Sequence, residues 1–205
     1  MTTARLRLDR VRELCGKLDR PGLATDMPIW VDHTRDETTV DQARIEDVLD
    51  GMELAGRAVL HVGVGNSGLA KRFAPLVELV DGLTVSEPEK ALADSLEIPN
   101  STVYLLSKYS REFLLHIGNR YDYVVDNNLA SFACCKYHFF RMLDNYLWCM
   151  KPGGRILTDQ RGMDWTVEDD PNWRLSYDDL VALEEILPVT ASALTDTVYE
   201  VRVRR

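Results

Sequence analysis

The sequence lacks the features that mark membrane proteins, secreted proteins and zinc proteins. No run of apolar residues approaches the roughly 18 that a membrane-spanning helix needs. The first residues, MTTARLRLDRVRELCGKL, carry too many charges for the apolar region of a secretion signal. Only four cysteines occur in 205 residues, none of them in a CxxC pair or with a histidine at metal-ligand spacing. We therefore expect a cytoplasmic protein without a zinc site.

Positive charge is also scarce in this chain. It has 24 lysines and arginines against 33 aspartates and glutamates, which gives a formal net charge of −9. Broad binding to a phosphate backbone requires clustered lysine and arginine, so this balance argues against nucleic acid as a partner. The sequence has no internal repeat and no linker rich in proline and glycine, and its hydrophobic fraction of 45% is that of a globular protein. We expect one domain over residues 1–205, with neither nucleic acid nor membrane as a partner.

The spacing of apolar residues divides the chain into an N-terminal part and a core. Residues 1–54 contain two stretches with apolar residues at helical spacing, 5–18 and 40–54, which predict a helical N-terminal cap. From Arg57 onward, short apolar runs alternate with helical stretches. The expected strands are 57–62, 82–86, 102–106, 121–125 and 154–158, and the expected helices between them are 67–77, 88–96, 109–118 and 131–149.

This alternation is typical of βαβ units that form a doubly wound, mostly parallel α/β sheet. The end of the chain breaks the pattern, because a helix at 176–187 is followed by two extended runs that meet near Thr195. Two successive strands predict an antiparallel pair. The core, residues 55–205, is therefore expected to be a Rossmann-like sheet of seven strands that ends in an antiparallel hairpin.

A glycine-rich loop follows the first expected strand. Residues 63–68 read GVGNSG, which fits the GxGxxG pattern of nucleotide-binding turns between a strand and a helix. Glu87 lies 19 residues beyond Gly68, at the end of the second expected strand, where a carboxylate accepts hydrogen bonds from both ribose hydroxyls. These features alone are typical of an oxidoreductase that uses NAD or NADP.

Two further features favour another cofactor. The stretch YDYVVDNN places Asp126 at the end of the fourth expected strand, and LWCMKPGGRILTDQ leads from a helix through a Lys-Pro-Gly-Gly turn into the fifth. Together with the terminal hairpin, these stretches resemble the class I S-adenosylmethionine-dependent methyltransferases, and the resemblance covers residues 55–205. It favours methyl transfer over hydride transfer. It also implies four cofactor-binding residues, which are Gly63, Gly65 and Ser67 in the loop and Glu87 at the ribose.

The sequence departs from this family at two positions. Members usually have an acidic residue two positions before the first glycine, where this chain has His61. The imidazole would orient the loop or reach the methionine part of the cofactor, or it is a hydrogen-bonded structural histidine, and the sequence leaves both interpretations open. Members often hold the adenine amine with an acidic residue after the third strand, whereas here Ser107 or backbone groups would have to serve.

Two catalytic schemes fit the sequence. In the first, Asp126, Asp159 and Gln160, at the ends of strands four and five, hold Mg²⁺ through oxygen ligands and lower the pKa of an acceptor hydroxyl. This arrangement is similar to that of metal-dependent O-methyltransferases of the catechol type, although Gln160 stands where an asparagine is usual. The alternative for these residues is that Asp126 only contacts the cofactor and that Asp159 serves as a cap or forms a salt bridge. In the second scheme, His33 in the N-terminal part acts as a metal-free general base.

The acceptor is expected to be a small molecule, with a saccharide as the leading class. The stretch RGMDWTVEDDPNWRLS places Trp165 and Trp173 among carboxylates, which suits stacking on a sugar ring, although anchoring a loop or a dimer contact is an equal alternative. The Asp/Asn-Pro-Pro-aromatic signature of nucleic-acid N-methyltransferases is absent from the sequence. A protein side chain stays open as an acceptor, because GNS also occurs in some protein lysine methyltransferases.

Two rival functions also stay open. One is an NAD(P)-dependent oxidoreductase built on the GxGxxG loop, for which the sequence offers no obvious proton relay. The other is a methyltransferase-fold binding module without chemistry, which His61 and the missing adenine acid would suit. A homodimer is expected only because dimers are common among soluble proteins.

Overall fold

The computed structural model describes residues 33–133, 136–166 and 174–204. The helix expected at 5–18, Trp173 and most of the expected N-terminal cap lie outside the described residues. The helix expected at 40–54 runs from Val40 to Asp50 as α1. Within the described ranges, no helix is both long and apolar enough to cross a membrane.

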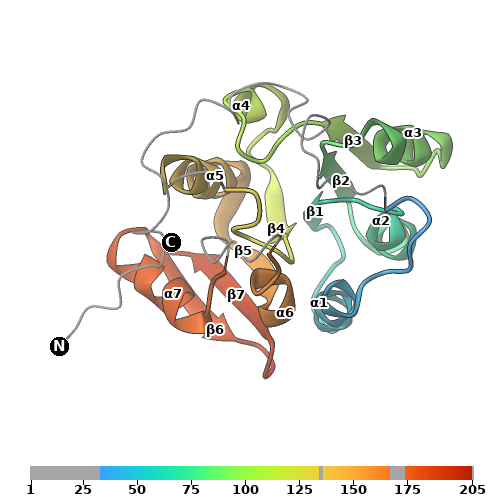
Figure 1. The fold of residues 1–205 in the computed structure, drawn as a ribbon. Coiled ribbons are helices and arrows are strands. Elements are labelled where there is room, and N and C mark those ends of the chain that lie inside the picture. Colours follow the sequence, from blue (N-terminus) through green and yellow to red (C-terminus); the bar gives the residue numbers. More distant parts are fainter. Residues whose placement is uncertain (1–32, 134–135, 167–173, 205) are drawn as a thin grey trace.

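Seven strands form one sheet in the order β3-β2-β1-β4-β5-β7-β6 (Figure 1). Neighbouring strands from β3 to β5 are parallel, whereas β7 runs antiparallel to both β5 and β6. This confirms the expected doubly wound α/β sheet with a C-terminal antiparallel hairpin. The chain proceeds outward in one direction from β1 and in the other from β4, so the strand order reverses between these two strands. The strands are β1 (Ala58–Val62), β2 (Leu79–Thr84), β3 (Ser101–Leu105), β4 (Tyr121–Val125), β5 (Met150–Asp159), β6 (Val189–Ala193) and β7 (Val198–Val203).

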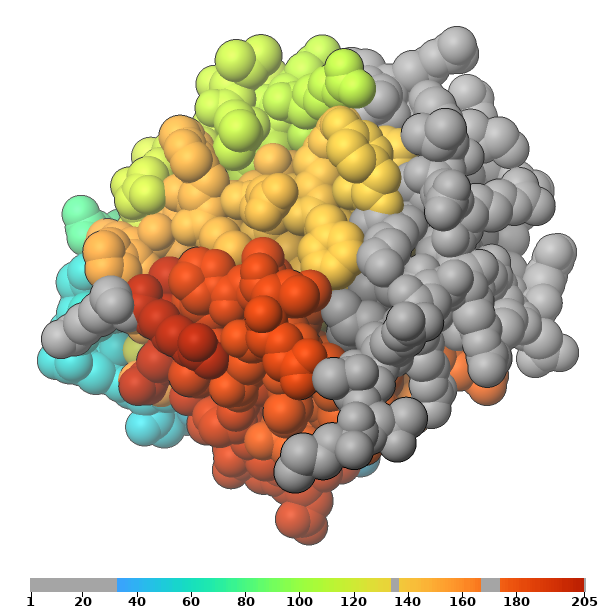
Figure 2. Space-filling view, turned by 90° about the vertical axis from the view of Figure 1, so that its left-hand side faces the viewer, coloured from blue at the N-terminus to red at the C-terminus, as the bar shows by residue number. Residues whose placement is uncertain are grey.

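Helices cover both faces of the sheet, and each face has its own hydrophobic core. Alternate side chains of a strand point to opposite faces. On β1, Leu60 belongs to the core beneath α4, α5 and α7, whereas Val59 belongs to the core beneath α1 and α2. Figure 2 shows residues around α5, in yellow to orange, beside the C-terminal part of the chain, in orange to red, on one side of the molecule. The remaining helices are α2 (Gly68–Phe73), α3 (Glu87–Ser95), α4 (Phe113–His116), α5 (Lys136–Cys149), α6 (Gln160–Met163) and α7 (Tyr177–Ala182).

β2 begins three residues earlier than expected, because a buried carboxylate interrupts its apolar pattern. Asp81 lies in the middle of β2 and is fully buried. Its carboxylate accepts hydrogen bonds from the Tyr121 hydroxyl at 2.6 Å, the Arg120 guanidinium at 2.5 Å and the Thr102 backbone N–H at 3.1 Å. These partners lie 21 to 40 residues further along the chain, so local sequence gave no sign that a strand tolerates this aspartate.

Two other elements also differ from their expected ranges. The Lys-Pro-Gly-Gly stretch belongs to β5 instead of preceding it, and Gly153 has a φ of 81° within the strand. The pairing of β4 with β5 accordingly shifts register between Tyr121 and Tyr123. The helix expected at 109–118 is reduced to α4, because residues 107–110 form a turn in which the Ser110 N–H donates to the Ser107 carbonyl at 3.0 Å.

Candidate active site

A cavity of about 570 Å³ opens at the carboxyl ends of the parallel strands, where the strand order reverses. Its wall is formed by the glycine loop after β1, by residues that follow β2, β3 and β4, by the segment 33–39 and by parts of α1 and α6. Ligands of doubly wound sheets bind at this crevice. The cavity has the size of a small-molecule site, for which roughly 300–1,000 Å³ is usual.

The glycine loop has the backbone conformation that its glycines predict. Gly63 and Gly65 have φ values of 80° and 49°, which disfavour any side chain, and both residues line the cavity. Among the described residues, no atom lies within 4 Å of the position of a Cβ at Gly63, so the backbone there faces open space. Ser67 does not line this cavity. It lines a separate space of about 10 Å³ that His61 also borders, and its buried hydroxyl has no partner among the described residues.

His61 is the last buried polar residue of β1 before the loop, and it borders both spaces. Burial lowers the pKa of its imidazole to about 4, against the opposing effect of the negative charge on Asp126. The imidazole is therefore neutral near pH 7, with one ring nitrogen as a donor and the other as an acceptor. Its place in the cavity wall is compatible with the predicted contact to a cofactor.

The carboxylate beside the end of β2 is Glu89, not the expected Glu87. Glu87 is exposed in the first turn of α3 and does not line the cavity. Glu89 is buried, lines the cavity and accepts a hydrogen bond from the Thr84 hydroxyl at 2.6 Å. Ser86 caps α3 by accepting a hydrogen bond from the Glu89 N–H at 3.3 Å. The spacing Ser-x-x-Glu is a sequence signal for a helix that starts after Ser86, but it predicts no contact of Glu89 with the cavity.

Ser107 lies at the cavity as expected, together with its neighbour Lys108. The Ser107 hydroxyl accepts a hydrogen bond from the Tyr109 N–H at 3.2 Å. This geometry leaves the hydroxyl proton available to an acceptor atom in the cavity, but it offers no carboxylate to an adenine amine. The predicted role of Ser107 in adenine recognition therefore depends on the hydroxyl and on backbone groups nearby.

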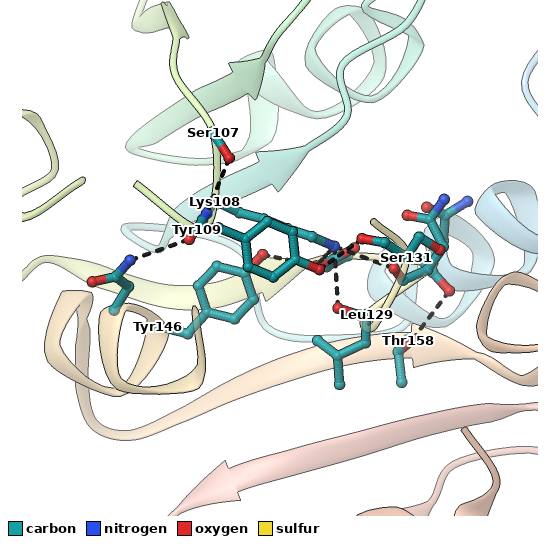
Figure 3. Close-up of polar contacts among 11 residues, drawn as sticks. Ser107, Lys108, Tyr109, Leu129, Ser131, Tyr146 and Thr158 are labelled. Carbon is teal, nitrogen blue, oxygen red and sulfur yellow. Dashed lines mark hydrogen bonds and ion pairs between the residues drawn. The ribbon is translucent and has the colours of Figure 1, made fainter. Parts of the chain in front are cut away.

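Asp126 is engaged in a buried network and does not line the cavity. One of its carboxylate oxygens accepts hydrogen bonds from Lys108 Nζ at 2.8 Å and from the Tyr146 hydroxyl at 2.7 Å (Figure 3). Burial of these groups raises the pKa of the Tyr146 phenol and lowers that of the Lys108 ammonium, while Asp126 opposes the latter effect. The other carboxylate oxygen is buried and has no hydrogen-bond partner among the described residues. Because Asp126 does not line the cavity, the structure does not bring it to the place where an acceptor would bind, as the expected roles of catalytic base and magnesium ligand require.

The other two expected metal ligands also have different partners. Asp159 caps α6 by accepting a hydrogen bond from the Arg161 N–H at 2.8 Å, and Arg44 lies 3.7 Å from its second carboxylate oxygen. The Gln160 side chain donates to the Leu175 carbonyl at 3.1 Å. Neither residue lines the cavity, and no group of three or more His, Cys, Asp or Glu side chains that suits a metal ion exists within residues 33–133, 136–166 and 174–204. The structure therefore gives no support to the magnesium site.

His33 lies at the cavity, against the glycine loop. Its Nδ1 is 2.7 Å from a carboxylate oxygen of Asp36, which also lines the cavity. The Asn66 side chain of the glycine loop donates to the Asp36 carbonyl at 2.7 Å, and a Cβ at Gly65 would lie 3.6 Å from His33 Cβ. The segment around His33 is therefore held directly over the loop, and its histidine and aspartate form a pair of the kind that orients a general base.

The opposite part of the wall comes from α1, from the loop after β4 and from α6. The Asn127 side chain donates to Asp41 of α1 at 2.5 Å. Gly162 of α6 packs so closely on the Asn127 backbone that any Cβ there would overlap its carbonyl. Phe132 and Trp165 line the cavity with their ring centroids 5.3 Å apart. The expected aromatic contribution of Trp165 is thus joined by Phe132, which the sequence had offered only as a helix residue.

The chain matches no family model, and the search of curated proteins found no match. Several solved structures are similar in fold. An S-adenosylmethionine-dependent methyltransferase from Aquifex aeolicus has a TM-score of 0.58 at 17% identity, covering 84% of this chain and 98% of that one. The N-methyltransferase NodS from Bradyrhizobium japonicum WM9, in complex with S-adenosyl-L-homocysteine, has a TM-score of 0.57 at 13% identity, covering 83% and 90%. The cyclase SpnF has a TM-score of 0.53 at 18% identity, covering 79% and 64%.

These neighbours identify the fold of this chain as that of the class I S-adenosylmethionine-dependent methyltransferases. The sequence predicted a terminal antiparallel hairpin, a feature that separates this class from dinucleotide-binding folds. The hairpin is present as β6 and β7. Because the identities are low, the comparison concerns the fold, and the chemistry has to be argued from the cavity.

Proposed function

We propose that the protein is an S-adenosylmethionine-dependent methyltransferase whose acceptor is a hydroxyl group of a small molecule. The observation that carries the proposal is the cavity at the reversal of strand order, bordered by the open backbone of Gly63 and Gly65. In a fold shared with methyltransferases, this is where a nucleotide-containing ligand has room to approach the main chain.

The residues of the cavity fit the parts of this cofactor. The backbone of the glycine loop gives space and N–H donors, and the neutral His61 offers one donor and one acceptor without adding charge. The buried carboxylate of Glu89 can accept hydrogen bonds from the two ribose hydroxyls, a role for which the exposed Glu87 is badly placed. The Ser107 hydroxyl and the adjacent backbone are the candidates for the adenine. When bound, the cofactor supplies an electrophilic methyl group on a sulfonium sulfur.

His33 is the candidate general base. An alcohol is a poor nucleophile at neutral pH, so a group that removes its proton assists the transfer. The contact of His33 Nδ1 with the Asp36 carboxylate at 2.7 Å orients the imidazole ring. In such a transfer His33 would take the acceptor O–H proton, while the cofactor would give its methyl group to the acceptor oxygen and leave as S-adenosylhomocysteine.

The far side of the cavity supports the proposed acceptor class. Phe132 and Trp165 present aromatic rings, and Asp164 beside them adds a carboxylate. Rings next to hydrogen-bonding groups suit a saccharide, which stacks a face of C–H bonds while its hydroxyls find polar partners. We therefore keep a saccharide hydroxyl as the leading acceptor.

The test of the cofactor is calorimetric titration with S-adenosylhomocysteine and, in parallel, NAD⁺. We expect binding of S-adenosylhomocysteine alone. Glu89→Gln should weaken it about 10- to 100-fold, because hydrogen bonds to a charged group contribute about 1.5–3 kcal/mol. Glu87→Gln is the matched control two residues away and should change the affinity less than about twofold.

The outcomes separate the alternatives. Binding of NAD⁺ without S-adenosylhomocysteine would replace the proposal with an oxidoreductase, and binding of neither would leave a module without this chemistry. A large effect of Glu87→Gln with none of Glu89→Gln would keep the cofactor and refute only the ribose assignment.

With wild-type binding established, methyl-labelled S-adenosylmethionine and a panel of glycosides test the acceptor. His33→Gln tests the base, through loss of turnover with unchanged cofactor affinity.

A further inference from the structure

The loop between β4 and α5 brings three residues to the cavity. Asn127, Asn128 and Phe132 all line it, whereas Asp126 at the end of β4 does not. Within the loop, the Ser131 N–H donates to the Asn128 carbonyl at 3.0 Å and the Ala133 N–H donates to the Ala130 carbonyl at 3.1 Å. Contacts from outside the loop also hold it: at its start, the Asn127 side chain donates to Asp41 at 2.5 Å and the Thr158 hydroxyl donates to the Asn127 carbonyl at 3.2 Å.

Further contacts, to residues 128–131, come from two consecutive residues after β3. Lys108 Nζ donates to the Asp126 carboxylate at 2.8 Å, to the Leu129 carbonyl at 3.1 Å and to the Asn128 carbonyl at 3.2 Å. The Tyr109 hydroxyl donates to the Ser131 carbonyl at 2.6 Å. In Figure 3 both side chains reach from the β3 side to the same loop. The two side chains thus bind three carbonyl groups of the loop backbone.

Lys108 and Tyr109 together form a clamp on the loop that ends at Ser131. The next residue, Phe132, has an unusual backbone conformation. Phe132 has a φ of 65°, a value that residues with a side chain seldom adopt and that costs about 1 kcal/mol or more. Such a conformation persists only when its surroundings impose it. Here the contact of Tyr109 with Ser131 lies one residue before Phe132. The Phe132 ring lies in the cavity wall, and its centroid is 5.3 Å from that of the Trp165 ring.

We propose that Lys108 is a positioning residue that, with Tyr109, holds the β4–α5 loop so that Phe132 forms part of the acceptor side of the cavity. The assignment of this side to the acceptor rests on the proposed methyltransferase function. Asp126 is then the counter-ion that lets a lysine ammonium be buried at this point. The two loop carbonyls bound by Lys108 distinguish this role from simple charge balance, because charge balance needs no contact to Asn128 or Leu129.

Hydrogen exchange measures the positioning directly. We expect Lys108→Met to accelerate amide exchange in residues 127–133 about tenfold or more, while exchange in the glycine loop, residues 63–68, changes less than about twofold. Fluorine NMR of protein labelled with fluorophenylalanine gives a second signal, since the chain has five phenylalanines and Phe132→Leu assigns the resonance of interest. That resonance should shift or broaden in Lys108→Met.

A double variant separates positioning from charge balance. Lys108→Met alone leaves the buried Asp126 carboxylate without its cation, so its melting temperature should fall. Lys108→Met/Asp126→Asn removes both charges and should recover part of the melting temperature, with loop exchange still accelerated. If the double variant also restores loop exchange to the wild-type rate, Lys108 only balances charge and the proposal is overturned.

A milder variant keeps the test valid if the lysine variants fail to fold. Tyr109→Phe removes only the hydroxyl that reaches Ser131 and should accelerate exchange at residues 131–133 severalfold. Unchanged exchange there would contradict the clamp.

Phe132→Ala tests the assignment to the acceptor side and should leave affinity for S-adenosylhomocysteine within about twofold, whereas a loss above tenfold would place Phe132 on the cofactor side. Absence of S-adenosylhomocysteine binding in the wild type would refute the proposed function and leave the exchange result intact.

Discussion

At the scale of single residues, the site depends on polar groups that are buried in defined protonation states. His61 is the clearest case, because it is 4% exposed and its pKa falls from 6.5 to about 4. The cause is the loss of hydration of the charged imidazolium, which the nearby Asp126 only partly offsets. A neutral side chain in this position would not repel the cationic cofactor that we propose for the glycine loop.

The lowered pKa predicts a pH dependence of stability. In the unfolded chain His61 takes up a proton as the pH falls below about 6.5, whereas in the folded protein it resists protonation until about pH 4. The stability associated with the neutral imidazole is therefore complete above pH 6.5 and is lost progressively as the pH falls to 4, by at most ~3 kcal/mol. Urea unfolding of wild type and His61→Asn between pH 7.5 and 4 isolates this effect, because the remaining groups are common to both proteins. A difference in unfolding free energy that does not change with pH would show that His61 is not buried as a neutral group.

At the scale of elements, the glycine loop depends on a glycine in the neighbouring strand. Gly82 of β2 lies beneath Val64 of the loop, and a Cβ at position 82 would overlap the Val64 side chain and lie 3.0 Å from that of Val103. The loop can approach the sheet because β2 has no side chain there. This contact connects the packing of β2 to the shape of the cavity.

Gly82→Ala should accordingly cost about 1–3 kcal/mol of stability and weaken binding of S-adenosylhomocysteine, because the added methyl group displaces the loop. Adding Val64→Ala relieves the main overlap and should recover part of both losses. Gly118→Ala is the control, since among the described residues no atom lies within 4 Å of its Cβ position, and it should change stability by less than about 0.5 kcal/mol. Unfolding in urea and calorimetry measure the two effects. An equal loss in Gly82→Ala and Gly118→Ala would refute the packing argument.

The elements also show how far the sequence predicts this structure. The strand and helix order followed from the alternation of apolar runs, and the hairpin followed from two successive strands. What the pattern missed depends on distant contacts. Asp81 is tolerated within β2 because Arg120 and Tyr121 donate to it. One oxygen of Asp126 is bonded because Lys108 reaches it from the end of β3. Spacing alone placed Glu87 near the ribose, but the start of α3 at that residue leaves it in solvent.

At the scale of the whole molecule, the cavity is a joint product of segments far apart in the chain. Asn66 ties the segment near His33 to the glycine loop, Asn127 ties α1 to the end of β4, and Lys108 ties the β3 side of the sheet to the β4 side. Unfolding of the domain would destroy this arrangement. A ligand that fills the cavity therefore binds the folded chain and has no equivalent site in the unfolded one.

Binding to the folded chain alone predicts a rise in melting temperature that reports on the cofactor without knowledge of the acceptor. At a concentration 100 times its dissociation constant, a ligand of the folded state alone adds about 2.7 kcal/mol of stability. For a chain of this size, each kcal/mol raises the melting temperature by roughly 2–4 °C, so saturating S-adenosylhomocysteine should raise it by about 5–11 °C. NAD⁺ at the same concentration should leave the melting temperature unchanged within about 1 °C. At the same concentration of S-adenosylhomocysteine, the melting temperature of Glu89→Gln should rise less than that of the wild type. The melting temperature of Glu87→Gln should rise as much as that of the wild type. A shift with NAD⁺ instead would mean that the same glycine loop holds a dinucleotide, and the site would then have to be explained as one for hydride transfer.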